Sequence, residues 1–307
     1  MRDTFVKALL LNARINERVM LITGDLGFGV LTNYAKELPV QFINAGVAEQ
    51  NMTGLAAGLA LEGRIVFTYS IANFPTLRCL EQIRNDVLYH EANVNIVAVG
   101  GGFSYGALGM SHHATEDVGI MRTLPGLRVF APCDEKETVA IVEQMVTNPA
   151  PSYLRLDKSK AVAPAADSFL LGKLRQMRRG ARVALVGYGG VVAEALAAAD
   201  LLDGAGIDCA VYSAHTLKPF DKESLIKLAV DFDVLVTIEE HVLTGGLGSL
   251  AADTFIDSGT IPRRFARMCL HDAYSSIVGS QEYLRVRHGL DASSIATRVR
   301  ELLESCM

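Results

Sequence analysis

Short apolar runs alternate with longer segments of helical periodicity along the first half of the chain. The runs rich in Val, Ile and Phe predict strands at Val19–Thr23, Gln41–Ile43, Arg64–Tyr69, Val94–Val99, Leu127–Ala131 and Ser152–Leu156. Helices are predicted between them, at residues 2–17, 47–61, 74–91, 115–123 and 134–147. The last helix has Asp134 as its N-cap, with Glu137 three residues on to complete a capping box. Strands that alternate with helices indicate a parallel sheet that is covered on both faces.

The pattern stops after Leu156 and then starts again. The stretch that follows contains Lys, Ser, Ala and Pro without periodicity, as is typical of a linker. Further strands are predicted at Val183–Gly187, Cys209–Tyr212, Val234–Ile238 and Arg264–Cys269, with helices at 190–203, 221–230, 246–257 and 291–304. The fold class is therefore α/β, with two consecutive open, mostly parallel-sheet domains. We expect them at residues 1–160 and 169–307, joined by a linker at 161–168.

Composition narrows the class of protein further. The formal charge of −5 over 307 residues argues against a nucleic-acid surface. No apolar run approaches the roughly 20 residues that a membrane span needs, and the N-terminus resembles an amphipathic helix and not a signal peptide. Five scattered cysteines argue against a disulfide framework and for the reducing cytoplasm, namely Cys79, Cys133, Cys209, Cys269 and Cys306. The mean hydropathy of +0.25 indicates large buried surfaces, some of them between subunits.

One acid stands out at the start of the predicted helix 47–61. Glu49 lies in its first turn, and small residues follow at Gly54, Ala56, Ala57, Gly58 and Ala60. Such a helix lets another backbone approach closely, so its start would be buried. A buried carboxylate is costly without a partner, and a hydrogen-bond donor on a bound ligand would supply one. The alternative is an ordinary exposed glutamate in a first helical turn.

The nine residues 44–52, Asn-Ala-Gly-Val-Ala-Glu-Gln-Asn-Met, resemble the cofactor-activating segment of thiamine diphosphate enzymes of the transketolase type. This resemblance implies that Glu49 hydrogen-bonds the aminopyrimidine ring of the cofactor and is catalytic. Residues 69–87 resemble the family segment that supplies an aromatic side chain to that ring. Phe74 takes this place, and Ile71 stands where the family often has an aromatic residue. Phe74 could instead be an ordinary core residue.

The loop 100–117 is rich in Gly and follows a buried strand, where open α/β sheets bind ligands. The resemblance places His112 at the family's substrate-binding and proton-shuttling histidine, and His113 at a neighbouring glutamine. Adjacent histidines rarely converge on one metal, so we expect no metal site in this chain. Lys158 matches a family arginine that holds substrate phosphate, and Arg155 is a second candidate. Both could instead be solvated linker cations.

Two positions depart from the pattern of ordinary transketolases. Leu108 replaces an aspartate that contacts a sugar hydroxyl, and Gly100 replaces a histidine that contacts the acceptor phosphate. The usual pentose phosphate pair therefore becomes doubtful. A less hydroxylated donor, a deoxy or otherwise altered sugar, or a different acyl acceptor is expected.

The resemblance covers residues 1–304 but only two of the family's three domains. The Gly-Asp-Gly followed by Asn, which binds Mg²⁺ and the cofactor diphosphate in the family, is missing here. We therefore expect an N-terminal partner subunit in an α₂β₂ assembly, with the cofactor at the interface. The resemblance places Asp25 near the cofactor and that interface, unless it is only a turn aspartate. It places His241 in the C-terminal domain, where an interface is one role open to it.

The sequence therefore predicts the C-terminal subunit of a split transketolase that acts on sugars or sugar phosphates. One alternative is a decarboxylating relative, either 1-deoxyxylulose-5-phosphate synthase-like or a 2-oxo acid dehydrogenase β subunit. A second is a non-catalytic scaffold.

Overall fold

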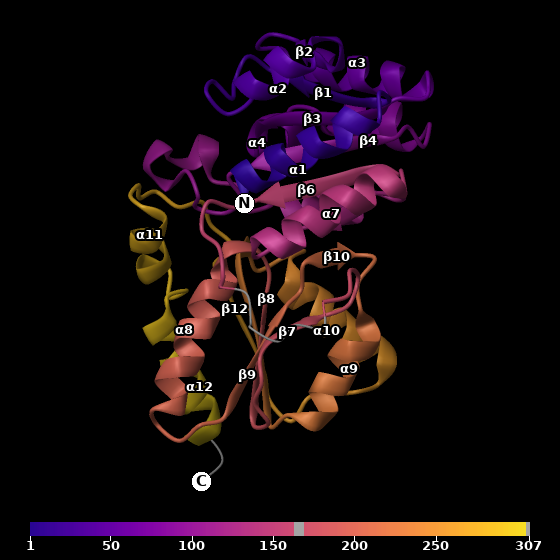
Figure 1. Ribbon diagram of the computed structural model, residues 1–307. Coiled ribbons are helices and arrows are strands. Elements are labelled where there is room, and N and C mark those ends of the chain that lie inside the picture. Colours follow the sequence, from indigo (N-terminus) through magenta and orange to yellow (C-terminus); the bar gives the residue numbers. More distant parts are fainter. Residues whose placement is uncertain (163–168, 305–307) are drawn as a thin grey trace.

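The computed structural model describes residues 1–162 and 169–304, so most of the predicted linker and Cys306 lie outside the described residues. Two sheets, each covered by helices, lie one above the other in Figure 1. No helix in the described ranges is both long and apolar enough to cross a bilayer.

The first sheet has seven strands in the order β10-β5-β6-β4-β3-β1-β2. Its parallel strands are β1 (Val19–Thr23), β2 (Phe42–Asn44), β3 (Ile65–Ile71), β4 (Val94–Val99), β5 (Arg128–Phe130) and β6 (Ser152–Leu156). Along β1, Leu21 and Ile22 belong to the apolar clusters on opposite faces of the sheet, and both are fully buried. This is why the strands are apolar runs without polar alternation.

Two layers of helices cover this sheet. Helices α1 (Arg2–Ile15) and α7 (Glu135–Thr147) pack in one cluster, with the short α2 (Thr32–Glu37) nearby. The opposite cluster contains α3 (Glu49–Leu61), the π-helix η2 (Ile83–Leu88) and α6 (Asp117–Thr123). At the start of α7 the side chain of Asp134 accepts from Glu137 N at 2.9 Å, which confirms the predicted N-cap. The Glu137 carboxylate reaches back to Cys133 N at 2.7 Å, one residue before the expected position.

The predicted helix 74–91 is wrong as a single helix. The chain forms α4 (Asn73–Thr76), a turn at 77–79, α5 (Leu80–Gln82) and then η2. Pro75 has no N–H to donate and is tolerated only in a first turn. Cys79, with φ −106° and ψ 10°, leaves the helical region and breaks the hydrogen-bond pattern.

The second sheet has five strands in the order β12-β11-β8-β9-β7. Its parallel strands are β8 (Val183–Gly187), β9 (Cys209–Ser213), β11 (Val234–Val242) and β12 (Phe265–Leu270), and β7 (Arg175–Arg178) is antiparallel. Helices α8 (Val192–Asp203) and α12 (Ala292–Glu304) cover one face, and α9 (Lys222–Asp231) and α10 (Leu247–Ser258) the other. The remaining short elements are α11 (Gln281–Arg287) and the turns η1 (Pro39–Gln41), η3 (Gly106–Leu108), η4 (Met110–His112) and η5 (Gly189–Val191).

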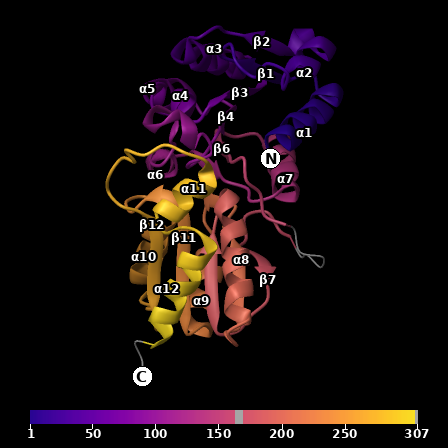
Figure 2. The same cartoon turned by 90° about the vertical axis from the view of Figure 1, so that its left-hand side faces the viewer.

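The two halves of the chain are joined by more than a linker. Strand β10 (Thr216–Lys218) follows β9 but pairs antiparallel with β5 at the edge of the first sheet. Val129 of β5 and Leu217 of β10 belong to an apolar cluster that continues into the second domain. Figure 2 shows the segment after β12 arching up to the first domain before it enters α11, where Gly279 N donates to Gly106 O at 3.3 Å. The domain boundaries at 160 and 169 stay a prediction.

Candidate active site

Glu49 is the first residue of α3, at the edge of the sheet where β1, β2 and β3 end. It is only 5% exposed, although it is charged and lies beside open loops. A Cβ atom added at Gly24, which follows β1, would lie 3.9 Å from Glu49 Oε1, so a bare backbone passes over the carboxylate. The free N–H groups at the start of α3 favour a negative charge at this place.

Arg78 is the residue that the sequence pattern did not identify. Its Nη1 donates to Glu49 Oε2 at 3.1 Å, and its guanidinium carbon lies 4.3 Å from the centre of the Phe74 ring. The turn at 77–79 brings it there, and its side chain remains 52% exposed. A cation four residues after the aromatic residue was the only signal in the sequence.

The loop with the two histidines is attached to the same place. Asn73 Nδ2 donates to Ser111 O at 3.1 Å and to His113 O at 2.8 Å. The His112 ring meets the Phe74 ring edge-on, with centres 5.3 Å apart. Glu49, Arg78, Phe74 and His112 thus form one continuous cluster.

The electrostatics of His112 suit a proton acceptor. Burial, with a smaller contribution from His113, lowers the pKa of His112 below its ordinary value of 6.5. The ring is therefore neutral at pH 7. Its Nδ1 lies 3.0 Å from Ser111 Oγ, which leaves Nε2 for a ligand.

Ile71 and Asp25 lie at the same edge of the sheet. Ile71 is the last residue of β3 and is half-buried. Asp25 is exposed in the loop after β1, with φ +56°, a conformation that Asp tolerates. Its carboxylate accepts from Asn44 Nδ2 at 3.0 Å, and its own N–H donates to Asn44 Oδ1 at 3.0 Å.

His113 and Arg155 are placed differently from what the sequence predicted. His113 is 4% exposed, and its Nε2 lies 3.0 Å from Gly106 O inside the loop. Arg155 is 1% exposed and pairs with Asp117 at 3.3 Å and Asp157 at 3.4 Å. Both side chains are buried in this structure, and contact of either with a substrate stays a prediction. The second domain buries Arg155, and this could not be read from the residues around it.

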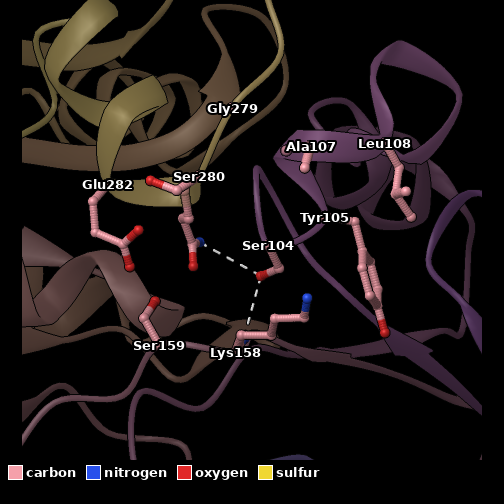
Figure 3. A pocket seen from close by; sticks show the side chains of 11 residues that line it. Ser104, Tyr105, Ala107, Leu108, Lys158, Ser159, Gly279, Ser280 and Glu282 are labelled. Atoms are coloured by element: carbon pink, nitrogen blue, oxygen red, sulfur yellow. Dashed lines mark hydrogen bonds between the residues drawn. The ribbon is translucent and has the colours of Figure 1, made fainter.

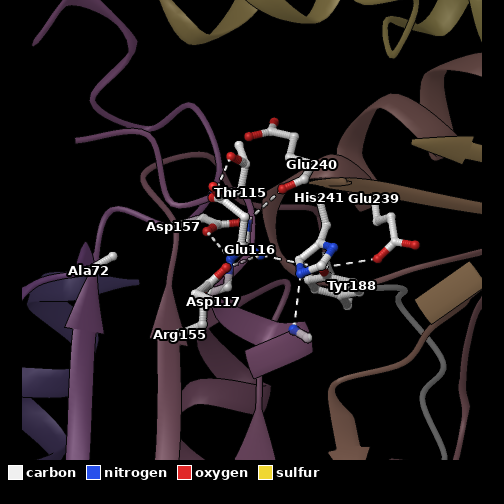
Figure 4. A network of polar contacts seen from close by, with 12 residues as sticks. Ala72, Thr115, Glu116, Asp117, Arg155, Asp157, Tyr188, Glu239, Glu240 and His241 are labelled. Carbon is white, nitrogen blue, oxygen red and sulfur yellow. Dashed lines mark hydrogen bonds and ion pairs between the residues drawn. The ribbon is translucent and has the colours of Figure 1, made fainter. Parts of the chain in front are cut away.

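Arg155 belongs to a network of polar contacts between the two domains, shown in Figure 4. Its Nη1 also donates to Tyr188 OH at 3.3 Å, and its Nη2 to Glu240 O at 3.3 Å. His241 Nε2 accepts from Gly119 N at 3.0 Å, which leaves Nδ1 to donate to Val242 O at 2.8 Å. His241, a residue of β11, therefore contacts α6 and has a structural position.

Lys158 lies in a cavity of about 630 Å³ between the domains (Figure 3). Its Nζ is 4.1 Å from the centre of the Tyr105 ring, and Leu108, 56% exposed, forms part of the wall. Residues 279–282 close the cavity from the side of the second domain. A Cβ atom at Gly100 would lie 2.2 Å from the Tyr105 ring, so no histidine fits there.

A candidate metal cluster lies elsewhere. Among the described residues, Cys133, Asp134 and Glu137 have ligand atoms within 4.8 Å of one another. Arg175 Nη1 already pairs with Asp134 at 2.8 Å and with Glu137 at 3.0 Å. The guanidinium thus supplies the positive charge that these carboxylates need.

Known proteins are similar to this chain over nearly its whole length. Residues 1–162 match the family of the transketolase pyrimidine binding domain, and residues 172–295 match that of the transketolase C-terminal domain. The chain is 36% identical to the 6-deoxy-6-sulfo-D-fructose transketolase subunit SqwH of Clostridium sp. (strain MSTE9), over 99% of this chain and 94% of that one. It is 33% identical to an apulose-4-phosphate transketolase subunit of Phocaeicola vulgatus, over 99% and 97%.

Longer proteins match as well. The 1-deoxy-D-xylulose-5-phosphate synthase of Heliobacterium modesticaldum is 34% identical over 99% of this chain, which corresponds to 47% of that protein. Among solved structures, a split-gene transketolase described as an inactive β4 tetramer has a TM-score of 0.88 and 34% identity, over 99% of this chain and 98% of that one.

Proposed function

This chain belongs to the transketolase family as the C-terminal subunit of a split transketolase, and we propose that it transfers a two-carbon ketol unit together with an N-terminal partner chain. The donor is a ketose or ketose phosphate, and the acceptor is an aldehyde. The observation that carries the proposal is the cluster of Glu49, Arg78, Phe74 and His112 at one edge of the first sheet.

Thiamine diphosphate fits this cluster. Glu49 is a buried carboxylate that pairs with the half-exposed Arg78 through one oxygen, so a ligand N–H can approach the other. The half-buried Phe74 offers a flat apolar face for a heteroaromatic ring. When bound, the cofactor supplies the nucleophilic carbon that ketol transfer needs. Glu49 would hold the proton at the far pyrimidine nitrogen, and the neutral His112 would accept a proton from a substrate hydroxyl.

The diphosphate and Mg²⁺ would be held by the partner chain. Two loops beside Glu49 carry exposed apolar residues, Phe28 at 83% and Val47 at 75%. Contiguous exposed apolar patches mark interaction surfaces, and we propose that these two side chains belong to one. These loops would therefore be covered in an α₂β₂ assembly. The similar β4 tetramer, which is described as inactive, agrees with a need for the partner.

The cavity at Lys158 supports an anionic sugar as the substrate. Lys158 is its exposed cation, Ser104 and Ser159 add hydroxyl groups, and Leu108 adds an apolar wall. A phosphate or sulfonate at one end of the sugar suits the lysine, while Leu108 suits a carbon without a hydroxyl. The names of two relatives refer to 6-deoxy-6-sulfo-D-fructose and to apulose 4-phosphate, that is, to a sugar with a sulfo group and a sugar with a phosphate. Carbohydrate metabolism in the cytoplasm is the setting that this function implies.

A decarboxylating synthase is the second candidate, because 1-deoxy-D-xylulose-5-phosphate synthases match almost the whole chain. Assays of the assembled pair with hydroxypyruvate, xylulose 5-phosphate and pyruvate separate the two. Ketol transfer from hydroxypyruvate or xylulose 5-phosphate without consumption of pyruvate supports the proposal. If pyruvate is the only one of the three donors that is consumed, the enzyme is a decarboxylating synthase and the proposal is wrong.

Glu49→Gln tests the central role directly. It keeps the shape of the side chain and removes the acid, so turnover should fall by at least about 100-fold. The control is Glu62→Gln at the other end of α3, which is exposed and should retain activity. Light scattering should show that both variants still assemble with the partner. Retained turnover in Glu49→Gln would contradict the proposal.

A further inference from the structure

Glu240 belongs to the second domain but binds the backbone of the loop that carries His112. It lies near the end of β11 and is 2% exposed. Its Oε2 accepts from Phe103 N, in the first domain, at 2.8 Å. Arg285 pairs with the same carboxylate, and Gln281 Nε2 donates to both of its oxygens, at 3.1 and 3.0 Å. Figure 4 shows Glu240 at the junction of the domains.

Gln281 extends this contact to the cavity wall. Its Nε2 lies 3.5 Å from Ser104 Oγ, which also accepts from Lys158 N at 3.2 Å (Figure 3). Ser104 Oγ donates to Gly101 O at 2.8 Å. The Glu240 carboxylate is therefore connected to the first domain in two ways. It accepts directly from Phe103 N, and it is linked through Gln281 to Ser104 in the cavity wall.

Phe103 connects the backbone that Glu240 binds to the histidines of the loop, because its ring packs against one of them. Its fully buried ring packs edge-on against His113 and is stacked on His288, with centres 5.1 Å apart in each case. Gly102 and Ala114 close the loop with a pair of hydrogen bonds of 2.8 and 3.0 Å. A shift of Phe103 would therefore move His113 and with it the adjacent His112.

The fit leaves no slack. Gly102 has φ +57°, and a Cβ atom there would lie 2.1 Å from Glu240 Oε2. The carboxylate thus packs directly on a bare backbone. Neighbouring Glu239 offers a contrast, because its carboxylate accepts from Leu247 N at 2.7 Å, Gly248 N at 2.8 Å and Tyr188 OH at 3.2 Å, all in the second domain, and none of these donors belongs to the His112 loop.

We propose that Glu240 is a positioning residue, which fixes the His112 loop through the Phe103 N–H and through Gln281. The inference rests on the proposed role of His112. It makes the second domain part of the framework of the active site, although the Glu49 cluster as defined above consists of residues of the first domain.

The test compares Glu240→Gln with Glu239→Gln in the complex with the partner chain. The Glu240→Gln change removes the charge opposite Arg285 and leaves one acceptor oxygen for three donors, Phe103 N, Gln281 Nε2 and Arg285 Nε. Hydrogen exchange of amides 101–114 should become at least about 10-fold faster, and kcat should fall about 10- to 100-fold with far less change in KM. Glu239→Gln should loosen the start of α10 but leave both readouts at the level of the unchanged protein.

Equal protection of 101–114 in Glu240→Gln and the unchanged protein would overturn the inference, as would an equal loss of kcat in both variants. If Glu240→Gln does not fold, Gln281→Ala decides on the same readouts, because it removes the link from Glu240 to Ser104 and leaves the contact between Phe103 N and Glu240 in place. The exchange measurement needs no turnover. A complex without transketolase activity but with a loosened loop would therefore refute the proposed function and leave the positioning role standing.

Discussion

Arg155 holds two buried carboxylates together at the boundary between the domains. Its partners Asp117 and Asp157 are 2% and 4% exposed, so neither can exchange the guanidinium for water. Removing one member of a buried ion pair leaves an uncompensated charge, which costs far more than the pair itself contributes. The residue thus acts on stability and on the relative placement of the domains.

Arg155→Met should therefore lower the free energy of unfolding by about 3–5 kcal/mol. Denaturant titration measures this. The control is Lys158→Met, because Lys158 is exposed and should change stability by no more than about 0.5 kcal/mol. A stable Arg155→Met variant that only loses affinity for an anionic substrate would contradict this expectation and would support the prediction that Arg155 binds substrate.

His112 should determine the acidic side of the pH profile. Its pKa is lowered from 6.5, mainly by burial, so the ring stays neutral to a lower pH than an ordinary histidine does. The kcat/KM of the assembled enzyme should stay level from pH 7.5 to 6.5 and fall at lower pH. In His112→Gln that fall should be missing, at a rate reduced about 100-fold. His90→Gln, on an exposed turn, is the control, and an unchanged acidic fall in His112→Gln would assign it to another group.

At the scale of elements, the local sequence pattern was sufficient to predict those strands and helices whose bounds depend on neighbouring residues. The apolar runs of β1, β4, β6 and β8 were predicted to the residue, and α3 was placed with Glu49 in its first turn. The comparisons confirm the fold class and the split transketolase subunit, whereas the roles of individual site residues stay predictions. The residues that carry the resemblance, 44–52, are contiguous in the sequence, which is why the family was recognisable.

Contacts made by distant segments were not predictable in this way. Arg78 reaches Glu49 only because the helix breaks at 77–79, and a helical periodicity gives no hint of that break. Strand β10 has three residues, too few for an alternation to be seen, and its partner β5 is far away in the sequence. Arg155 was predicted as a substrate-binding cation or a solvated linker cation, because its contacts with Tyr188 and Glu240 of the second domain cannot be read from the neighbouring sequence.

The turn between β9 and β10 packs on the start of α7 and should make stability depend on pH. His215 is fully buried, with both ring nitrogens lacking hydrogen-bond partners among the described residues, and its Nδ1 is 3.7 Å from Glu137 Oε1. Burial lowers the pKa of His215 below 6.5, although the charge of Glu137 opposes this. As the pH falls through 6.5, the unfolded chain takes up a proton that the folded chain does not, so stability is lost with acidification.

His215→Phe should remove this contribution. The free energy of unfolding of the unchanged protein should fall more steeply between pH 6.5 and 5 than that of the variant, by at most about 1.4 kcal/mol per pH unit. Denaturant titrations of both proteins at several pH values measure the difference. Parallel pH dependences would show that His215 becomes protonated equally in the folded and unfolded states.

At the scale of the whole molecule, the binding of cofactor should depend on the partner. The carboxylates that come closest to a metal cluster among the described residues are already paired with Arg175. Calorimetry should therefore show thiamine diphosphate and Mg²⁺ binding to the assembled pair and little heat with this chain alone. Chelation of Mg²⁺ should abolish the signal of the pair. Tight Mg²⁺-dependent binding to the isolated chain would place the ligands here.

Strand β10 is translated after β9 of the second sheet but completes the first sheet, and this sets an order of events during translation. The edge of β5 leaves the ribosome long before Thr216–Lys218 exists, and at about 5–20 residues per second the wait lasts several seconds. During that interval the unpaired N–H and C=O groups of the nascent chain can pair with those of a neighbouring polypeptide. Chaperones that shield such edges should therefore raise the yield of native protein, and slower codons between β6 and β10 should lower it.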